Sequence, residues 1–135
     1  AATAARAARP THEAKVAAWA AVVHSDALPN ALQAATIAGF GRVHDPGLLA
    51  PFVEPYFAML EAVWAARTSE AARMLVTGLY PTRLADHPGV DVLGETDAWL
   101  AGHADVAPAL RRLLVEARDG VRRARAAQVG DRARG

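Results

Sequence analysis

The sequence contains no cysteine, one lysine and few aromatic residues. Without cysteine the chain has neither a disulfide framework nor a thiol nucleophile, and a reducing compartment, the cytoplasm, is the expected location. No uninterrupted apolar run reaches the ~18 residues of a membrane-spanning helix, and the pattern of a signal peptide is missing. We therefore expect neither a membrane partner nor a cleaved leader.

The motifs that carry zinc or nucleophile chemistry are also missing. His12-Glu13 begins an H-E-x-x-H pattern, but Val16 occupies the second histidine position, so one helix face does not present two imidazole ligands. Ser25 and Ser69 are better interpreted as helix caps than as nucleophiles. No two of the five histidines are three or four residues apart; they are residues 12, 24, 44, 87 and 103. We predict no catalytic residue, metal site or cofactor within this chain.

What the sequence does contain is a composition typical of helices. Alanine supplies 34 of the 135 residues, and alanine gives up little side-chain entropy in a helix. A hydrophobic content of 53% excludes a disordered chain, and the length indicates one domain. No segment alternates apolar and polar residues over the length of a strand. The sequence therefore predicts an all-α fold of about six helices joined by short loops.

The segment 48–67 carries the strongest helical signal, and we expect the other helices to pack around it. Its apolar residues recur at steps of three and one, which is typical of one buried helix face. Pro51 and Pro55 each remove a backbone donor, so we predict an entry turn or kink before about Glu54. The expected buried stripe consists of Leu49, Phe52, Val53, Tyr56, Phe57, Leu60, Val63 and Trp64.

Caps and apolar spacing predict further helices over about 12–24, 28–40, 69–79, 96–102 and 108–128, with an irregular segment at 82–94. In the first of these we expect Val16, Trp19, Ala20 and Val23 on the buried face. We interpret residues 1–10 as the tail of a preceding helix, 11–128 as the helical domain and 129–135 as a frayed tail. The three tryptophans lie at spacings near the ~40–47 residues of HEAT-type helix pairs.

Several short runs resemble, in their order and spacing, the C-terminal region of bacterial aminopeptidase N, and most closely the actinobacterial kind. The similarity covers about residues 9–128, except for 83–94, which does not align. The runs are Leu28-Pro29-Asn30-Ala31, Ala38-Gly39-Phe40, the stretch LAPFVEPYF at 49–57, Thr96-Asp97-Ala98-Trp99-Leu100, Leu110-Arg111-Arg112-Leu113 and Arg118-Asp119-Gly120-Val121. The chain begins with alanine rather than methionine, so it is either processed or a piece of a longer protein, and the resemblance implies the piece.

The resemblance implies an α-α superhelix of HEAT-like pairs that closes over a catalytic domain and forms a wall of the peptide cavity. In that family the zinc, its H-E-x-x-H helix, a downstream glutamate ligand and a G-x-M-E-N loop lie in the preceding catalytic domain. None of those motifs occurs here. The implied function is that of a non-catalytic C-terminal domain of a zinc aminopeptidase, an enzyme that removes N-terminal residues from peptides. Its implied partners are the catalytic domain and the peptide substrate.

Two alternatives remain open from the sequence. One is a free-standing helical ligand-binding module, such as the effector domain of a repressor, which DNA-binding helices would precede. The other is a scaffold whose concave face binds a protein. The coding sequence upstream of Ala1 distinguishes them, because a zinc motif there favours the aminopeptidase and a helix-turn-helix favours the repressor.

The end of the chain is strongly basic. Residues 111–135 contain eight arginines and three acids. Without a helix-turn-helix or interleaved aromatic residues, we expect no nucleic-acid partner. On a helical wheel, four arginines form a stripe beside the core with no acid next to them, which suits a peptide carboxylate or an acidic surface of the catalytic domain. The alternative is a solvated basic face near a helix C-terminus. The four are Arg111, Arg118, Arg122 and Arg125.

Overall fold

The computed structural model describes residues 2–134, with the side chains of 5–131 and 133. Within that range the chain consists of helices and loops, which confirms the predicted all-α class. The α-helices are α1 (Ala2–Ala7), α2 (His12–Val23), α3 (Asn30–Phe40), α4 (Val53–Ala66), α5 (Ser69–Gly78), α6 (Val92–Gly102) and α7 (Pro108–Arg134). Two 3-10 helices, η1 (Pro46–Phe52) and η2 (Thr82–Leu84), lie between them.

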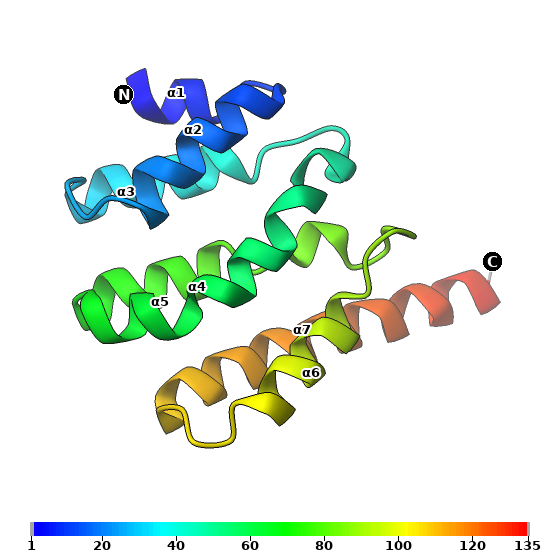
Figure 1. Cartoon of the computed structure of the whole chain (residues 1–135). Helices are drawn as coiled ribbons and strands as arrows, with labels where there is room; N and C mark the ends of the chain where they lie inside the picture. The colour runs from blue at the N-terminus through cyan, green and yellow to red at the C-terminus, as the bar shows by residue number, and fades with distance from the viewer. Residues whose placement is uncertain (1, 135) are drawn as a thin grey trace.

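The helices form three layers that follow one another along the chain (Figure 1). The first layer holds α1, α2 and α3, the second holds α4 and α5, and the third holds α6 and α7. In each layer two long helices run antiparallel and are joined by a short loop, as expected for helix pairs. The superhelical form of a HEAT array stays a prediction.

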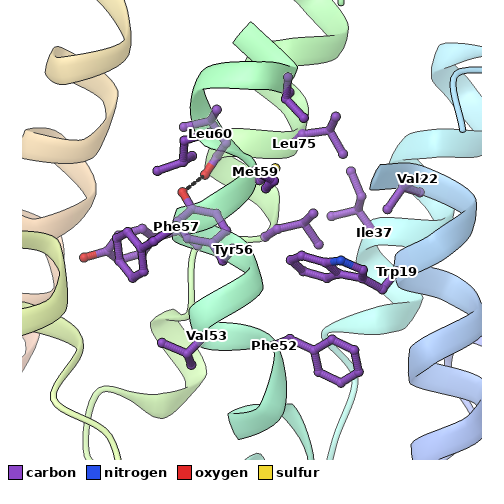
Figure 2. Packing of buried hydrophobic residues seen from close by; sticks show 14 of the residues in the cluster. Trp19, Val22, Ile37, Phe52, Val53, Tyr56, Phe57, Met59, Leu60 and Leu75 are labelled. Atoms are coloured by element: carbon purple, nitrogen blue, oxygen red, sulfur yellow. Dashed lines mark hydrogen bonds between the residues drawn. The ribbon is translucent and has the colours of Figure 1, made fainter. Parts of the chain in front are cut away.

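The segment 48–67, which the sequence predicts to be the central helix, lies in the middle of the core. It begins as η1 and becomes an α-helix at Val53, which confirms the predicted entry turn. The Asp45 carboxylate starts this turn by accepting a hydrogen bond from Gly47 N at 2.9 Å. Figure 2 shows Tyr56, Met59 and Leu60 of α4 among side chains of the neighbouring layers. Trp64 is only half-buried at the edge of this core, so the expectation of full burial is wrong for that residue.

The segment Pro46–Ala66 is long and apolar enough, by length and composition, to cross a membrane. In this structure its apolar side is covered by the rest of the chain: six residues of α4 are buried, among them Tyr56, Leu60 and Val63. The Tyr56 hydroxyl donates to Val76 O of α5 at 2.5 Å. The segment therefore serves as the core helix of the fold.

A series of hydrogen bonds joins the second layer to the third. The Tyr80 and Thr96 hydroxyl oxygens are 2.7 Å apart, and Thr96 also donates to Val92 O at 2.7 Å. The Tyr56 and Tyr80 rings meet edge to face with centroids 5.8 Å apart. Burial raises the pKa of Tyr56 well above its ordinary value. Burial and the nearby Asp97 carboxylate also raise the pKa of Tyr80, although its hydrogen bond to Thr96 acts in the opposite direction. Both phenols are therefore neutral near pH 7.

The buried face of α2 differs from the prediction. Val16 is 45% exposed, whereas Lys15 is completely buried. The Lys15 ammonium donates to three carbonyl oxygens, those of Ala7 at 2.6 Å, Gly39 at 3.0 Å and Arg42 at 3.1 Å. An ammonium has three N–H donors, so this position satisfies all of them. The lysine thereby ties the end of α1 to the end of α3. The buried residues of α2 are Lys15, Ala18, Trp19 and Val22, so the buried face lies one residue before the expected one.

The boundaries of the last two helices also differ. Helix α6 begins at Val92 rather than near Thr96, because the Asp91 carboxylate caps it by accepting from Gly94 N at 3.0 Å. The region expected to be irregular therefore contributes the first turn of a helix. Helix α7 continues to Arg134, beyond the predicted end near residue 128, so the segment expected to fray is helical over its described part.

Candidate functional site

A recess with a volume of about 470 Å³ lies between the first two layers. Its walls come from α2, α3, η1, the start of α4, α5, the loop that follows α5 and η2. Thr77, Thr82 and Arg83 add polar groups, and the apolar walls include Trp19, Ile37, Phe40, Phe52, Leu79 and Tyr80. Sequence reasoning missed this recess because no single stretch of the chain contains more than part of its wall.

Close contact between α3 and α5 shapes the recess. A Cβ atom on Gly78 would lie 2.6 Å from the Ile37 Cγ2 atom, well inside van der Waals contact. Glycine at this position therefore lets the two helices approach more closely than any larger residue would allow. The Gln33 side chain of α3 also connects the two helices, because its amide nitrogen donates a hydrogen bond to Ala71 O of α5 at 3.3 Å.

A second, basic recess of about 420 Å³ adjoins the first. Arg83 lines both, and Arg42 and His44 line the second together with Ala8, Pro10 and Val43. No acidic residue lines it, and the ion pairs found across residues 2–134 involve neither Arg42 nor Arg83. Guanidinium groups in such a position suit a carboxylate or another anion.

The four arginines predicted to form one stripe on α7 do not share the same surroundings in the structure. Arg118 and Arg122 meet at a pair of acids, Asp97 of α6 and Asp119 of α7. Arg118 NH1 lies 2.9 Å from Asp97 Oδ1 and its Nε lies 3.2 Å from Asp119 Oδ1. Arg122 lies 3.7 Å from each of the two carboxylates. The expectation that no acid lies beside these arginines is therefore wrong, because Asp119 on α7 itself and Asp97 on the adjacent α6 both reach them.

The hydrogen bond to Asp97 is the largest of the effects that raise the pKa of Arg118 above its ordinary value, so this guanidinium stays charged. Its side chain is only 21% exposed, whereas that of Arg122 is 54% exposed. On α7 itself, Asp119 pairs with both Arg118 and Arg122. Arg118 thus joins α6 to α7, and Arg122 has more of its surface free for a partner.

Arg111 and Arg125 differ from the other two. The Arg111 guanidinium donates to Leu100 O at 2.9 Å and to His103 O at 3.2 Å, so it caps the C-terminal end of α6. Arg125 is exposed, and the C-terminal end of α7 extends past the other helices (Figure 1). Of the four predicted contact residues, Arg122 and Arg125 are therefore the two that can reach an external partner most readily.

Within the described residues no three His, Cys, Asp or Glu side chains are grouped so that they could hold a metal ion. His103 makes an ion-pair contact with Glu61, its Nε2 atom lying 3.2 Å from Oε1. The described residues therefore offer apolar and cationic surfaces for binding.

Comparison with known proteins identifies the family. The family described as ERAP1-like C-terminal domain matches residues 1–123. The chain belongs to the ERAP1-like C-terminal domain family. Aminopeptidase N of Streptomyces lividans is similar to it, with 51% identity over 129 residues. That similarity covers 96% of this chain and 15% of the length of the relative.

The family match confirms the resemblance to the C-terminal region of aminopeptidase N. An ERAP1-like C-terminal domain is one part of a longer polypeptide in the Streptomyces relative, since the matched region is a small share of its length. The match ends at residue 123, so the last part of α7 extends past the region that the family shares.

Proposed function

We propose that this chain is the non-catalytic C-terminal domain of a zinc aminopeptidase and that it closes the peptide cavity of the catalytic domain. The family match over residues 1–123, to a domain described as C-terminal, carries this proposal. The 51% identity with an aminopeptidase N supports it further. On this view the zinc and the catalytic groups belong to the preceding part of the polypeptide, and the whole enzyme works in the cytoplasm.

The catalytic domain is the main proposed partner, and the peptide is the second. Arg122 and Arg125 are the proposed contacts to an acidic surface or to a carboxylate of a long peptide, because they are the most exposed of the four predicted arginines. Arg111 and Arg118 are proposed to act indirectly by fixing α7 against α6, since their guanidinium groups already bind groups of α6.

The first experiment assays the purified chain for hydrolysis of amino-acid anilides with and without zinc. We expect no turnover, because a catalytic zinc needs three protein ligands and an open coordination site. Zinc-dependent turnover that survives repurification and scales with the amount of this chain would refute the proposal. Deletion of the same domain from the parent aminopeptidase should alter the cleavage of long peptides more than that of anilides.

The second experiment replaces Arg122 and Arg125 together with glutamine in the parent enzyme. We expect KM to rise about two- to tenfold for long peptides, because two exposed charge contacts are lost, with little change for single-residue anilides. Arg123→Gln is the matched control, since Arg123 is an exposed arginine of the same helical turn. Equal changes for both substrate types would indicate altered domain closure, and an unchanged KM would exclude a peptide contact at these arginines.

A further inference from the structure

The recess between the first two layers has a buried aromatic floor. Trp19, Phe40 and Phe52 all line it, and all three side chains are buried. Their rings contact one another, with centroid separations of 5.7, 5.4 and 5.0 Å. Rings that pack against each other in this way form a firm surface for a flat, apolar molecule.

The rim of the recess is exposed and carries few polar groups, which Thr77, Thr82 and Arg83 contribute. The Thr77 hydroxyl already donates to the backbone of its own helix at 2.8 Å. The Tyr80 hydroxyl is bound to that of Thr96, with the two oxygen atoms 2.7 Å apart. Among the described side chains of the rim, the Thr82 hydroxyl and the Arg83 guanidinium are therefore the donors that a ligand can use.

The charged groups around the recess are all cationic. Arg83 also lines the adjoining basic recess, where Arg42 and His44 are its neighbours. Among the described residues, neither recess has an Asp or Glu in its wall. A carboxylate at this position meets guanidinium groups whose planar donor pattern matches its two oxygen atoms. An ammonium group on the same ligand would find no carboxylate partner and would be repelled by the arginines.

We propose that the two recesses form a binding site for a small free carboxylic acid that has an aromatic body and no amino group. The aromatic body occupies the recess between the layers, and the carboxylate binds Arg83 with Arg42 beside it. The volume of about 470 Å³ lies within the range of about 300–1,000 Å³ that is usual for sites of small molecules.

A peptide chain fits this recess less well than a small acid. The amide groups of a peptide need hydrogen-bond partners. Two sides of the recess are formed by α3 and α5, and the backbone groups within a helix are already paired along the helix. The exposed donors of the rim suffice for one carboxylate and do not extend along a chain.

Binding should hold the first two layers together, because the ligand would contact α2 and α3 on one side and α5 on the other. A molecule of about 14 non-hydrogen atoms with one exposed ionic contact typically binds with a Kd of roughly 10 μM to 1 mM. A ligand that binds only the folded chain also raises Tm as its concentration increases.

The experiment titrates the full 135-residue chain with indole-3-propionate and follows binding by calorimetry and thermal melts. This probe has an aromatic body and a carboxylate without an amine. We expect saturable binding with a Kd below about 1 mM. Indole-3-propionamide lacks the charge and L-tryptophan adds an ammonium group, so both should bind at least about tenfold more weakly.

Two variants locate the bound probe, and each changes an exposed residue so that the fold should be kept. Arg83→Gln removes the charge of the rim and should weaken binding about fivefold or more. Ala38→Leu places a larger side chain at the mouth of the recess and should weaken binding by a similar factor. Arg73→Gln is the matched control, because Arg73 is an exposed arginine of α5 that lines neither recess.

Binding of indole-3-propionate that is weakened by Arg83→Gln and by Ala38→Leu, and unchanged by Arg73→Gln, supports the site. The absence of binding at about 5 mM probe would overturn the proposal, and so would equal binding of the amide or of L-tryptophan. Unchanged affinity in Arg83→Gln and Ala38→Leu would place the probe elsewhere and also overturn it. Tighter binding of an acetylated tripeptide that ends in tryptophan would assign the recess to a peptide instead of a free acid.

Discussion

Replacing Lys15 with methionine tests whether a buried ammonium holds the first layer together. Methionine has a similar unbranched stem and fills most of the same volume, so the substitution removes the charge and the donors without opening a large cavity. The ammonium also lies 5.9 Å from the centre of the Phe40 ring, and this contact is lost with the charge.

The expected loss of stability depends on whether the three carbonyl oxygens keep another hydrogen-bond donor. Gly39 O keeps a second donor, Arg42 N at 3.1 Å, whereas Ala7 O loses the 2.6 Å bond from Lys15. An unsatisfied buried carbonyl costs about 1–3 kcal/mol. Burial lowers the pKa of Lys15, so removing the charge also relieves a desolvation penalty and offsets part of the loss. We expect a net loss of roughly 2 kcal/mol, or about 4–8 °C in Tm.

The assay combines urea unfolding with hydrogen exchange of the α1 segment. We expect Lys15→Met to unfold at lower urea concentration and to lose amide protection in residues 2–9, because α1 is tied to the rest of the layer through this side chain. Val16→Met is the matched control: it is the next residue of α2, it is 45% exposed, and its stability should change by less than about 0.5 kcal/mol. Equal stability of the two variants would refute the buried ammonium.

Trp64→Ala should destabilise the chain by about 1–2 kcal/mol in chemical denaturation, less than the ~3–5 kcal/mol of a fully buried tryptophan, because this side chain is half-buried; a larger loss would place it in the core. Gly78→Ala should lower Tm by several degrees, since the new Cβ would lie 2.6 Å from Ile37 Cγ2, and the loss should be smaller in an Ile37→Leu background, because leucine has no methyl branch at Cβ. Burial raises the pKa of Tyr56 and Tyr80, so the unfolded chain releases these protons first and stability should fall as the pH rises above about 10. Tyr80→Phe should reduce that alkaline loss in a pH series of thermal melts.

Elements whose boundaries depend on local signals could be predicted from the sequence. Helix α5 begins after the Thr68 cap and buries Ala72, Leu75 and Val76, as its spacing indicates. The entry turn before α4 follows from two prolines and the Asp45 cap. In both cases the residues that decide the structure are within one or two turns of each other, so the pattern alone contains the information.

Features that depend on contacts between distant segments could not be predicted in the same way. Lys15 is a polar residue in the pattern, and only the carbonyl groups at the ends of α1 and α3 explain its burial. Arg118 has an acid partner because Asp97, 21 residues earlier, lies on the adjacent helix. The recess between the first two layers likewise needs segments from Trp19 to Leu84 to come together. A helical wheel shows which residues share a face and does not show what lies opposite that face.

The burial of Lys15 has a chemical consequence outside stability. It is the single lysine of the sequence, and its side chain is completely buried. Reagents that acylate primary amines need an accessible, unprotonated nitrogen, and the folded lysine side chain offers neither. Labelling of Lys15 would therefore require α2 to move away from the ends of α1 and α3. The rate of acylation at this one nitrogen would measure how often the first layer opens in the intact protein, without any engineered probe.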